Sequence, residues 1–228
     1  SDFVTKYNER NPGKEVLYFN YAAVDDSLTN EKCSFWHFRW DASSSIKMAA
    51  ITNYLKSQAN VKKVYLINQD YSFGQGLRKL AVDMLKQKRP DVQIVGDELH
   101  PLLKITDFAP YISKIKASGA DSVITGNWGQ DIALLLKAAA DAGLQANWYP
   151  YYAGGAGGPT AIKQAGLQHK VFDIVEGNPN TAIEAAQKTE EEFRGKFGVT
   201  LWYPRAVNEM RMFAKAVKEA NSVDPKAV

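Results

Sequence analysis

Residues 61–76, VKKVYLINQDYSFGQG, narrow the choice of fold more than any other part of this sequence. Their apolar run at 64–67 has the length and composition of a parallel strand that is buried on both faces. The polar, glycine-containing residues 68–76 follow this run and predict a turn. Apolar residues then recur at helical spacing as far as Pro90, where proline ends a helix. The sequence therefore predicts a strand, a loop and a helix in succession.

The same succession recurs on both sides of this unit. Further strands are expected at 15–23, 92–95, 122–125, 148–152 and 172–175. The aromatic run 35–40 is either a short strand or an interfacial segment. Helices are expected at 108–119, capped by Thr106 or Asp107, and at 131–143, and a flexible glycine-rich segment at 154–159. An N-cap at 41–43 introduces a helix that turns four side chains inward: Ile46, Ala49, Ala50 and Leu55. Three strand–loop–helix units in series predict an α/β fold with a doubly wound parallel sheet.

Two helices without intervening strands are expected after Gly177. A capping box at Thr181 and Glu184 starts the first, whose inward side chains are Ile183, Ala186, Phe193 and Phe197. Pro204 starts the second, whose apolar face is Val207, Met210, Phe213, Ala214 and Val217. These helices must cover a sheet made elsewhere, and the sheet containing 15–23 is the candidate. We therefore expect two lobes, with the chain crossing near 41–44 and again near 177–180.

Composition excludes several kinds of protein. Hydrophobic residues make up 45% of the 228 residues, which supports a packed core. A formal net charge of +3 gives no electrostatic support for a nucleic-acid partner. No apolar run approaches the roughly 18 residues that a membrane helix needs. Cys33 is the only cysteine, so no intrachain disulfide can form.

The motifs do not support an enzyme, a cofactor or a metal site. Residues 74–76 form a Gly-x-Gly after a strand, but Lys79 stands where a dinucleotide fingerprint needs its third glycine. A tight turn is the better interpretation of this pair. The chain has no phosphate-binding loop and no nucleophile elbow. Its three histidines are too scattered to suggest a metal site: His37, His100 and His169.

Aromatic side chains gather at or beyond the carboxyl ends of the predicted strands: Tyr71, Phe73, Trp128, Tyr149, Tyr151 and Tyr152. In an open parallel sheet, ligands bind at that edge. The polar neighbours of these rings are Asn68, Gln69, Asn127 and Gln130. Small-molecule clefts combine apolar area with a few placed polar groups, so the pattern favours a cleft of that kind. Core packing is the alternative for each ring taken singly.

In their order and spacing, five stretches resemble the type I periplasmic binding proteins of ABC importers, especially the leucine/isoleucine/valine-binding branch. They are NYAAVDDSLTNEKC, HFRWDASSS, VYLINQDYSFGQGL, TDFAPYISKIKASGADSVITGNWGQD and KAAADAGL. The resemblance runs from about Tyr18 to Glu219. It implies two Rossmann-like α/β lobes with parallel sheets, which are joined by three crossover segments and close around a ligand.

The resemblance also assigns the lobes. It makes 1–42 part of lobe 1, 43–178 lobe 2, and 179–228 the return to lobe 1. Such proteins begin with several more strand–helix units of the first lobe, and residues 1–12 look like the tail of a helix. We therefore expect the chain to be a fragment with an incomplete first lobe.

A set of ligand-binding positions follows from the resemblance. The family's Ala-Ala-Thr loop matches 22–24, where Val24 lacks the threonine hydroxyl. The family's pocket tyrosine matches Phe73, its next aromatic residue matches Trp128, and a looser alignment adds Trp202. Together with the residues at the strand ends, the predicted ligand-binding residues are Ala22, Val24, Tyr71, Phe73, Asn127, Trp128, Tyr152 and Trp202.

Tyr152 stands where the family has the acidic residue that pairs with the α-ammonium of the ligand. An ammonium buried without a carboxylate partner costs about 1–3 kcal/mol or more. The resemblance therefore implies a ligand without an α-ammonium: an aromatic or hydrophobic carboxylate, or another small neutral or anionic metabolite. Asp70 or Asp131 could supply the missing carboxylate instead, and amino-acid binding would then be retained.

The leading prediction is a non-enzymatic, periplasmic substrate-binding component of an ABC import system. It would deliver an amino-acid-like or carboxylate ligand to a permease in the inner membrane. The alternative is the same fold used as a ligand-sensing domain of a receptor or transcription regulator. A nucleotide-dependent enzyme is disfavoured by the incomplete glycine motif. Because part of one lobe is missing, self-association of the fragment through exposed sheet surface is a further alternative.

Overall fold

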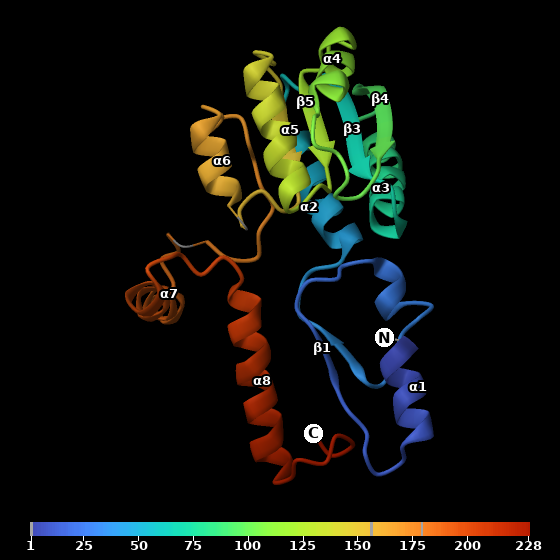
Figure 1. The fold of residues 1–228 in the computed structure, drawn as a ribbon, viewed down its shortest axis with the longest axis vertical. Coiled ribbons are helices and arrows are strands. Elements are labelled where there is room, and N and C mark those ends of the chain that lie inside the picture. Colours follow the sequence, from blue (N-terminus) through green and yellow to red (C-terminus); the bar gives the residue numbers. More distant parts are fainter. Residues whose placement is uncertain (1, 156, 179) are drawn as a thin grey trace. The chain divides into compact units, whose positions relative to one another are not determined.

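The computed structural model of the chain describes residues 2–155, 157–178 and 180–228 (Figure 1). It forms two compact units. Unit 1 combines the residues up to Ser43 with Glu176–Val228, and unit 2 is the continuous segment Ser44–Val175. The predicted lobe limits, 1–42, 43–178 and 179–228, remain a prediction about the whole protein.

Unit 2 is built on a four-stranded parallel sheet in the order β4-β3-β5-β6. Its strands are β3 (Lys63–Gln69), β4 (Gln93–His100), β5 (Ser122–Thr125) and β6 (Asn147–Pro150). The central strand β3 is buried along six of its seven residues, as its apolar run predicts. The prediction of an α/β fold with parallel strands is therefore confirmed.

Helices lie on both sides of this sheet (Figure 1). They are α2 (Ser44–Lys56), α3 (Ser72–Lys88), α4 (Ala109–Ala117), α5 (Gln130–Asp141) and α6 (Gly158–Gln164). Tyr65 and Ile67 of β3 pack into one core with α4 and α5. Val64 and Leu66 alternate with them and face the opposite side of the sheet. Both faces of β3 are thus covered, which is why the strand reads as a continuous apolar run.

Unit 1 has a smaller sheet than unit 2, with two strands rather than four. It contains α1 (Asp2–Arg10), β1 (Tyr18–Asn20), the 3-10 helix η1 (Asp26–Thr29), β2 (His37–Arg39), α7 (Glu184–Phe197) and α8 (Pro204–Ala220). Strands β1 and β2 pair in parallel over three residues each. Phe19 of β1 joins them to α8, because its ring lies 5.0 Å from that of Phe213. The run 35–40 therefore contains a strand, β2.

Three expectations about unit 2 were wrong. Gly74 and Gly76 lie inside α3 rather than in a loop, because β3 extends to Gln69 and the helix already begins at Ser72. Residues 172–175 form no strand, since only Val171 makes an isolated bridge, to Trp148. Ile46 is 60% exposed, and α2 instead buries Met48, Ile51 and Leu55. Position 156 of the predicted flexible segment lies outside the described residues, and the segment ends in the unpredicted helix α6.

In unit 1 the expected capping box is also wrong. Helix α7 starts only at Glu184, so the Thr181 hydroxyl accepts from the Ile183 amide, before the helix. Five side chains expected to face inward are exposed: Ile183, Ala186, Phe197, Met210 and Ala214. Pro204 does begin α8, as predicted. Position 179 of the predicted crossing lies outside the described residues.

Candidate ligand-binding site

Five aromatic residues of unit 2 follow the carboxyl ends of β3, β5 and β6. The turn from β3 into α3 consists of Asp70 and Tyr71 only. The Asp70 amide donates to the His100 carbonyl at 2.7 Å, which ties this turn to the end of β4. The short turn places Tyr71 and Phe73 directly at the edge of the sheet, at the start of α3.

Five rings form what we term the aromatic cluster: Tyr71, Phe73, Trp128, Tyr151 and Tyr152. Trp128 donates its indole N–H to the Tyr71 hydroxyl at 2.9 Å. The centre of the Phe73 ring lies 5.7 Å from that of Tyr71, 6.0 Å from Tyr151 and 6.3 Å from Tyr152. Residues from three separate segments thus meet around Phe73, as expected for a site at the carboxyl edge of a parallel sheet.

A buried lysine lies against this cluster. The Lys47 ammonium on α2 is 4.7 Å from the centre of the Tyr152 ring, and Lys47 is only 4% exposed. A cation over an aromatic face is attracted by the negative face of the ring. The Tyr151 hydroxyl donates to the Ser44 carbonyl on the same helix, at 2.8 Å. Helix α2 thereby brings one positive charge to the Tyr151–Tyr152 end of the cluster.

Asp173 holds the backbone that follows Tyr152. Its carboxylate accepts from the Ala153 amide at 3.0 Å and from the Gly154 amide at 2.6 Å. Burial raises the pKa of Asp173 to about 6, against the opposing effects of these hydrogen bonds and of the Lys47 charge. The segment that positions Tyr152 therefore depends on a carboxyl group that titrates near neutral pH.

This gives a prediction for stability. Because the folded chain holds the Asp173 proton more tightly than the unfolded chain, the free energy of unfolding falls as pH rises from about 4 to about 6. The change from 3.8 to about 6 corresponds to about 3 kcal/mol. Denaturant unfolding of the wild type and Asp173→Asn should show the difference between their stabilities changing by up to that amount across this range. A difference that stays constant with pH would contradict the prediction.

Two polar side chains at the same edge are turned inward. Asn127 is fully buried, and its amide lies 2.8 Å from His100 Nε2, so it fixes the loop after β5 to the end of β4. Gln69 donates to the Asp131 carboxylate at 2.7 Å, and the Leu103 amide donates to the same oxygen at 2.9 Å. Asp131 is fully buried as well. A ligand would reach Asn127 or Asp131 only if the hydrogen bonds that these side chains make with His100, Gln69 and Leu103 were broken.

In unit 1, Asn20 shapes the loop that follows β1. Its side-chain oxygen accepts from the Ala22 and Ala23 amides at 3.2 and 2.7 Å, and its NH2 group donates to the Ala23 carbonyl. The Asn20 amide also lies 3.0 Å from His37 Nε2. Burial lowers the pKa of His37, so a neutral ring that accepts from Asn20 is favoured. Ala22 is exposed in this loop, whereas Val24 is buried.

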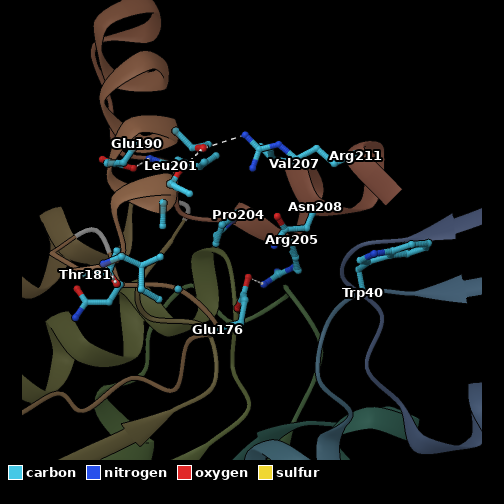
Figure 2. A pocket seen from close by; sticks show the side chains of 16 residues that line it. Trp40, Glu176, Thr181, Glu190, Leu201, Pro204, Arg205, Val207, Asn208 and Arg211 are labelled. Carbon is cyan, nitrogen blue, oxygen red and sulfur yellow. Dashed lines mark hydrogen bonds and ion pairs between the residues drawn. The ribbon is translucent and has the colours of Figure 1, made fainter. Parts of the chain in front are cut away.

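Unit 1 also contains a pocket of about 470 Å³ (Figure 2). Helices α7 and α8, the segments before them and Trp40 line it. Arg205 and Glu176 point toward each other within it and form an ion pair (Figure 2). Trp202 lies just before α8, is 36% exposed and is not among the lining residues.

Residues 3–228 match the family described as "Periplasmic binding protein". The chain belongs to the periplasmic binding protein family. This confirms the family predicted from the sequence. The predicted periplasmic location agrees with it. No helix in the described part of the chain has both the length and the apolar character needed to span a membrane.

Several periplasmic binding proteins are similar to this chain. "Leu/Ile/Val-binding protein homolog 4" of Brucella abortus is 36% identical over 221 residues, which cover 94% of this chain and 51% of that protein. The chain therefore spans about half the length of the curated relatives it matches. The leucine-, isoleucine-, valine-, threonine- and alanine-binding protein of Brucella ovis, solved in a closed conformation, has a TM-score of 0.79 at 34% identity, covering 98% of this chain and 57% of that one.

A more distant structure has the same fold. The amino acid ABC transporter substrate-binding protein of Pseudomonas fluorescens has a TM-score of 0.81 at 17% identity. The match covers 98% of this chain and 60% of that one. The predicted fold of the type I periplasmic binding proteins is thus confirmed for the part of the protein present here.

The ligand-binding residues predicted for this periplasmic binding protein fall into two sets. In unit 2 the structure brings four of them together, namely Tyr71, Phe73, Trp128 and Tyr152, while Asn127 is buried against His100. Ala22, Val24 and Trp202 belong to unit 1. Ligand contact remains a prediction for all eight residues.

Sequence reasoning missed several residues at these sites: Asn20, Lys47, Asp173, Glu176 and Arg205. Each is a polar side chain with at least one partner on another segment, and local periodicity gives no signal for that contact. Lys47 is the partial exception, because it lies between Ile46 and Met48 on a helix expected to be buried. A charge in that context is a signal for a buried partner.

Proposed function

We propose that this chain is part of a non-enzymatic solute-binding protein that delivers a small molecule to the permease of an ABC importer. Membership of the periplasmic binding protein family supports this, and the aromatic cluster at the carboxyl edge of the unit 2 sheet is the observation that carries it. Such a cluster offers apolar area beside a few placed polar groups, which is the composition of a small-molecule site. The two lobes of the whole protein would close around the ligand.

We further propose that the ligand is an aromatic or hydrophobic carboxylate without an α-ammonium. The Lys47 ammonium beside Tyr152 supports this, because it would repel a ligand ammonium and attract an anionic group. Each of the two alternative acids has a partner for one oxygen. Asp131 is fully buried and accepts through Oδ2 from the Gln69 side chain, and Asp70 accepts from the Gln75 side chain at 2.8 Å.

The relatives support a competing ligand class. The Brucella proteins are named for binding leucine, isoleucine, valine and, in one case, threonine and alanine. A thermal-shift screen of the whole protein decides between the two classes. Its panel sets leucine, isoleucine, valine and phenylalanine against benzoates, phenylpropanoids and small aliphatic acids. Ligand at 100 times its dissociation constant adds about 2.7 kcal/mol of stability. Shifts with amine-free acids alone are expected, and shifts with leucine would reject this ligand class.

A paired substitution tests the role of Tyr152. A carboxylate introduced by Tyr152→Glu alone would pair with Lys47, so the informative variant is Tyr152→Glu with Lys47→Met. We expect its affinity for leucine to rise by about tenfold or more, because a charge-assisted hydrogen bond to the α-ammonium contributes about 1.5–3 kcal/mol. Isothermal titration measures the affinity. The control, Tyr152→Gln with Lys47→Met, has the same shape without the charge. Equal leucine affinity in both variants would show that residue 152 does not face the ligand.

A further inference from the structure

A buried arginine at the start of α8 contacts three distant segments of unit 1. Arg205 is only 4% exposed. Its Nε donates to the Tyr21 carbonyl, its Nη1 pairs with the Glu176 carboxylate, and its Nη2 lies 3.5 Å from Asp41 Oδ2. The guanidinium also lies 4.4 Å from the centre of the Tyr203 ring. Figure 2 shows the Arg205 and Glu176 side chains directed at each other.

Two of these partners, Asp41 and Glu176, lie where the chain passes between the two units. Asp41 is two residues before Ser43, where the first segment of unit 1 ends, and Glu176 is the residue at which the chain returns to unit 1. Both connections between the units are therefore bound, at their unit 1 ends, by the same guanidinium. Tyr21 immediately precedes Ala22, which opens the loop predicted to bind ligand. Arg205 thus joins that loop to both connections.

Arginine is suited to this position for a geometric reason. Its planar group carries five donors in a fixed arrangement, so it can serve a carbonyl and two carboxylates at once, whereas lysine is a compact charge on a flexible stem. The Asp41 side chain is fully buried and that of Glu176 is 23% exposed. These two carboxylates share one buried cation, so Arg205 offsets negative charge at both positions.

We propose that Arg205 is a positioning residue that fixes both connections to the Ala22–Val24 loop, so that ligand binding and movement of the two units are coupled. The proposal rests on the proposed function where it concerns ligand. Arg205 holds the unit 1 ends of both connections, at Asp41 and Glu176, in fixed positions. Without it, the units sample more arrangements, and a smaller fraction of them is competent to bind. An apparent dissociation constant rises in inverse proportion to that fraction.

The test uses Arg205→Lys in the whole protein and measures the distance distribution between the units by pulsed electron paramagnetic resonance. Spin labels go on Lys188→Cys and Lys86→Cys, which are exposed on α7 and α3, in a Cys33→Ser background because Cys33 is exposed. The matched control is Arg194→Lys, which alters an ion pair with Glu190 elsewhere in unit 1. Circular dichroism and thermal unfolding establish that each variant is folded.

Without ligand, we expect Arg205→Lys to give a broader distribution than the wild type, while Arg194→Lys leaves it unchanged. If Arg205→Lys is too unstable to measure, Glu176→Gln removes the charge of one partner and should broaden the distribution in the same direction. Equal widths in all folded variants would overturn the proposal. This comparison needs no ligand, so it stands apart from the proposed function.

The second arm adds benzoate or leucine as the probe. For the probe that shifts the wild-type distribution, we expect Arg205→Lys to bind about tenfold more weakly by titration and to show a smaller shift. Unchanged affinity and shift in Arg205→Lys would overturn the coupling. If neither probe changes the wild type, the proposed ligand classes are rejected, while the comparison without ligand still decides the role of Arg205.

Discussion

Replacing Gly74 by alanine is expected to lower the free energy of unfolding by about 3 kcal/mol or more. A Cβ at this position would lie 1.9 Å from the Gln69 carbonyl oxygen and 3.3 Å from Asn68 Cβ. The first of these atoms is backbone in the central strand, so no flexible side chain can make room. Helix α3 would have to move away from the end of β3 and carry Phe73 with it. Guanidinium unfolding of the whole protein measures the loss.

Gly76→Ala is the matched control for this prediction. Gly76 lies two residues further along α3, and a Cβ there would meet nothing within 4 Å. Alanine is preferred to glycine inside a helix, so this variant should be more stable than the wild type by about 0.5–1 kcal/mol. If Gly74→Ala behaved like Gly76→Ala, the close approach of α3 to β3 would be wrong.

Replacing Phe73 by alanine is expected to destabilise the protein by about 3–5 kcal/mol. Phe73 is 6% exposed, and its ring contacts three rings of the aromatic cluster: Tyr71, Tyr151 and Tyr152. Its removal leaves a cavity between segments that reach the site from separate strands. Chemical unfolding measures the effect on stability, and the thermal shift produced by benzoate measures the effect on the site.

Two further variants separate packing from recognition at Phe73. Phe73→Leu keeps most of the volume but loses the ring, so it should remain folded and respond less to benzoate. Ile46→Ala serves as the control for a large apolar residue that is exposed, with an expected change within about 0.5 kcal/mol. A loss below 1 kcal/mol in Phe73→Ala, or a large loss in Ile46→Ala, would contradict the packing described here.

The strands of unit 2 could be predicted from the sequence, whereas the beginning of α3 could not. The run 64–67 is apolar because β3 is buried on both faces, so its composition directly reports its position. The glycines at 74 and 76 indicate a turn when only local propensity is considered. Gly74 is instead required by the approach of a backbone oxygen five residues earlier, and that distance exists only in the folded chain.

The candidate site was also predictable only in part: its aromatic residues were predicted from the sequence, and its charged residues were not. Six aromatic residues at strand ends were predicted to gather, because the carboxyl ends of parallel strands share one edge. Five of them form the aromatic cluster, whereas Tyr149 stacks on Phe172 instead. The charged groups were not predictable. Arg205 has one partner 29 residues away and another 184 residues away, so no sequence window contains the contact. Helices α7 and α8 were misjudged for the same reason, since they bury Glu190, Arg205 and Glu209 rather than the apolar side chains expected.

The discontinuous path of unit 1 also has a consequence for the order of folding during synthesis. Unit 2 is one continuous segment, so all of its residues have been synthesised once Val175 has been added. The contact between Arg205 and Tyr21 spans 184 residues and must wait for α8. Domains generally fold as units while the chain is being made. The nascent protein therefore passes through a stage in which unit 2 has been synthesised, but Arg205 is not yet available to contact Tyr21 and Asp41.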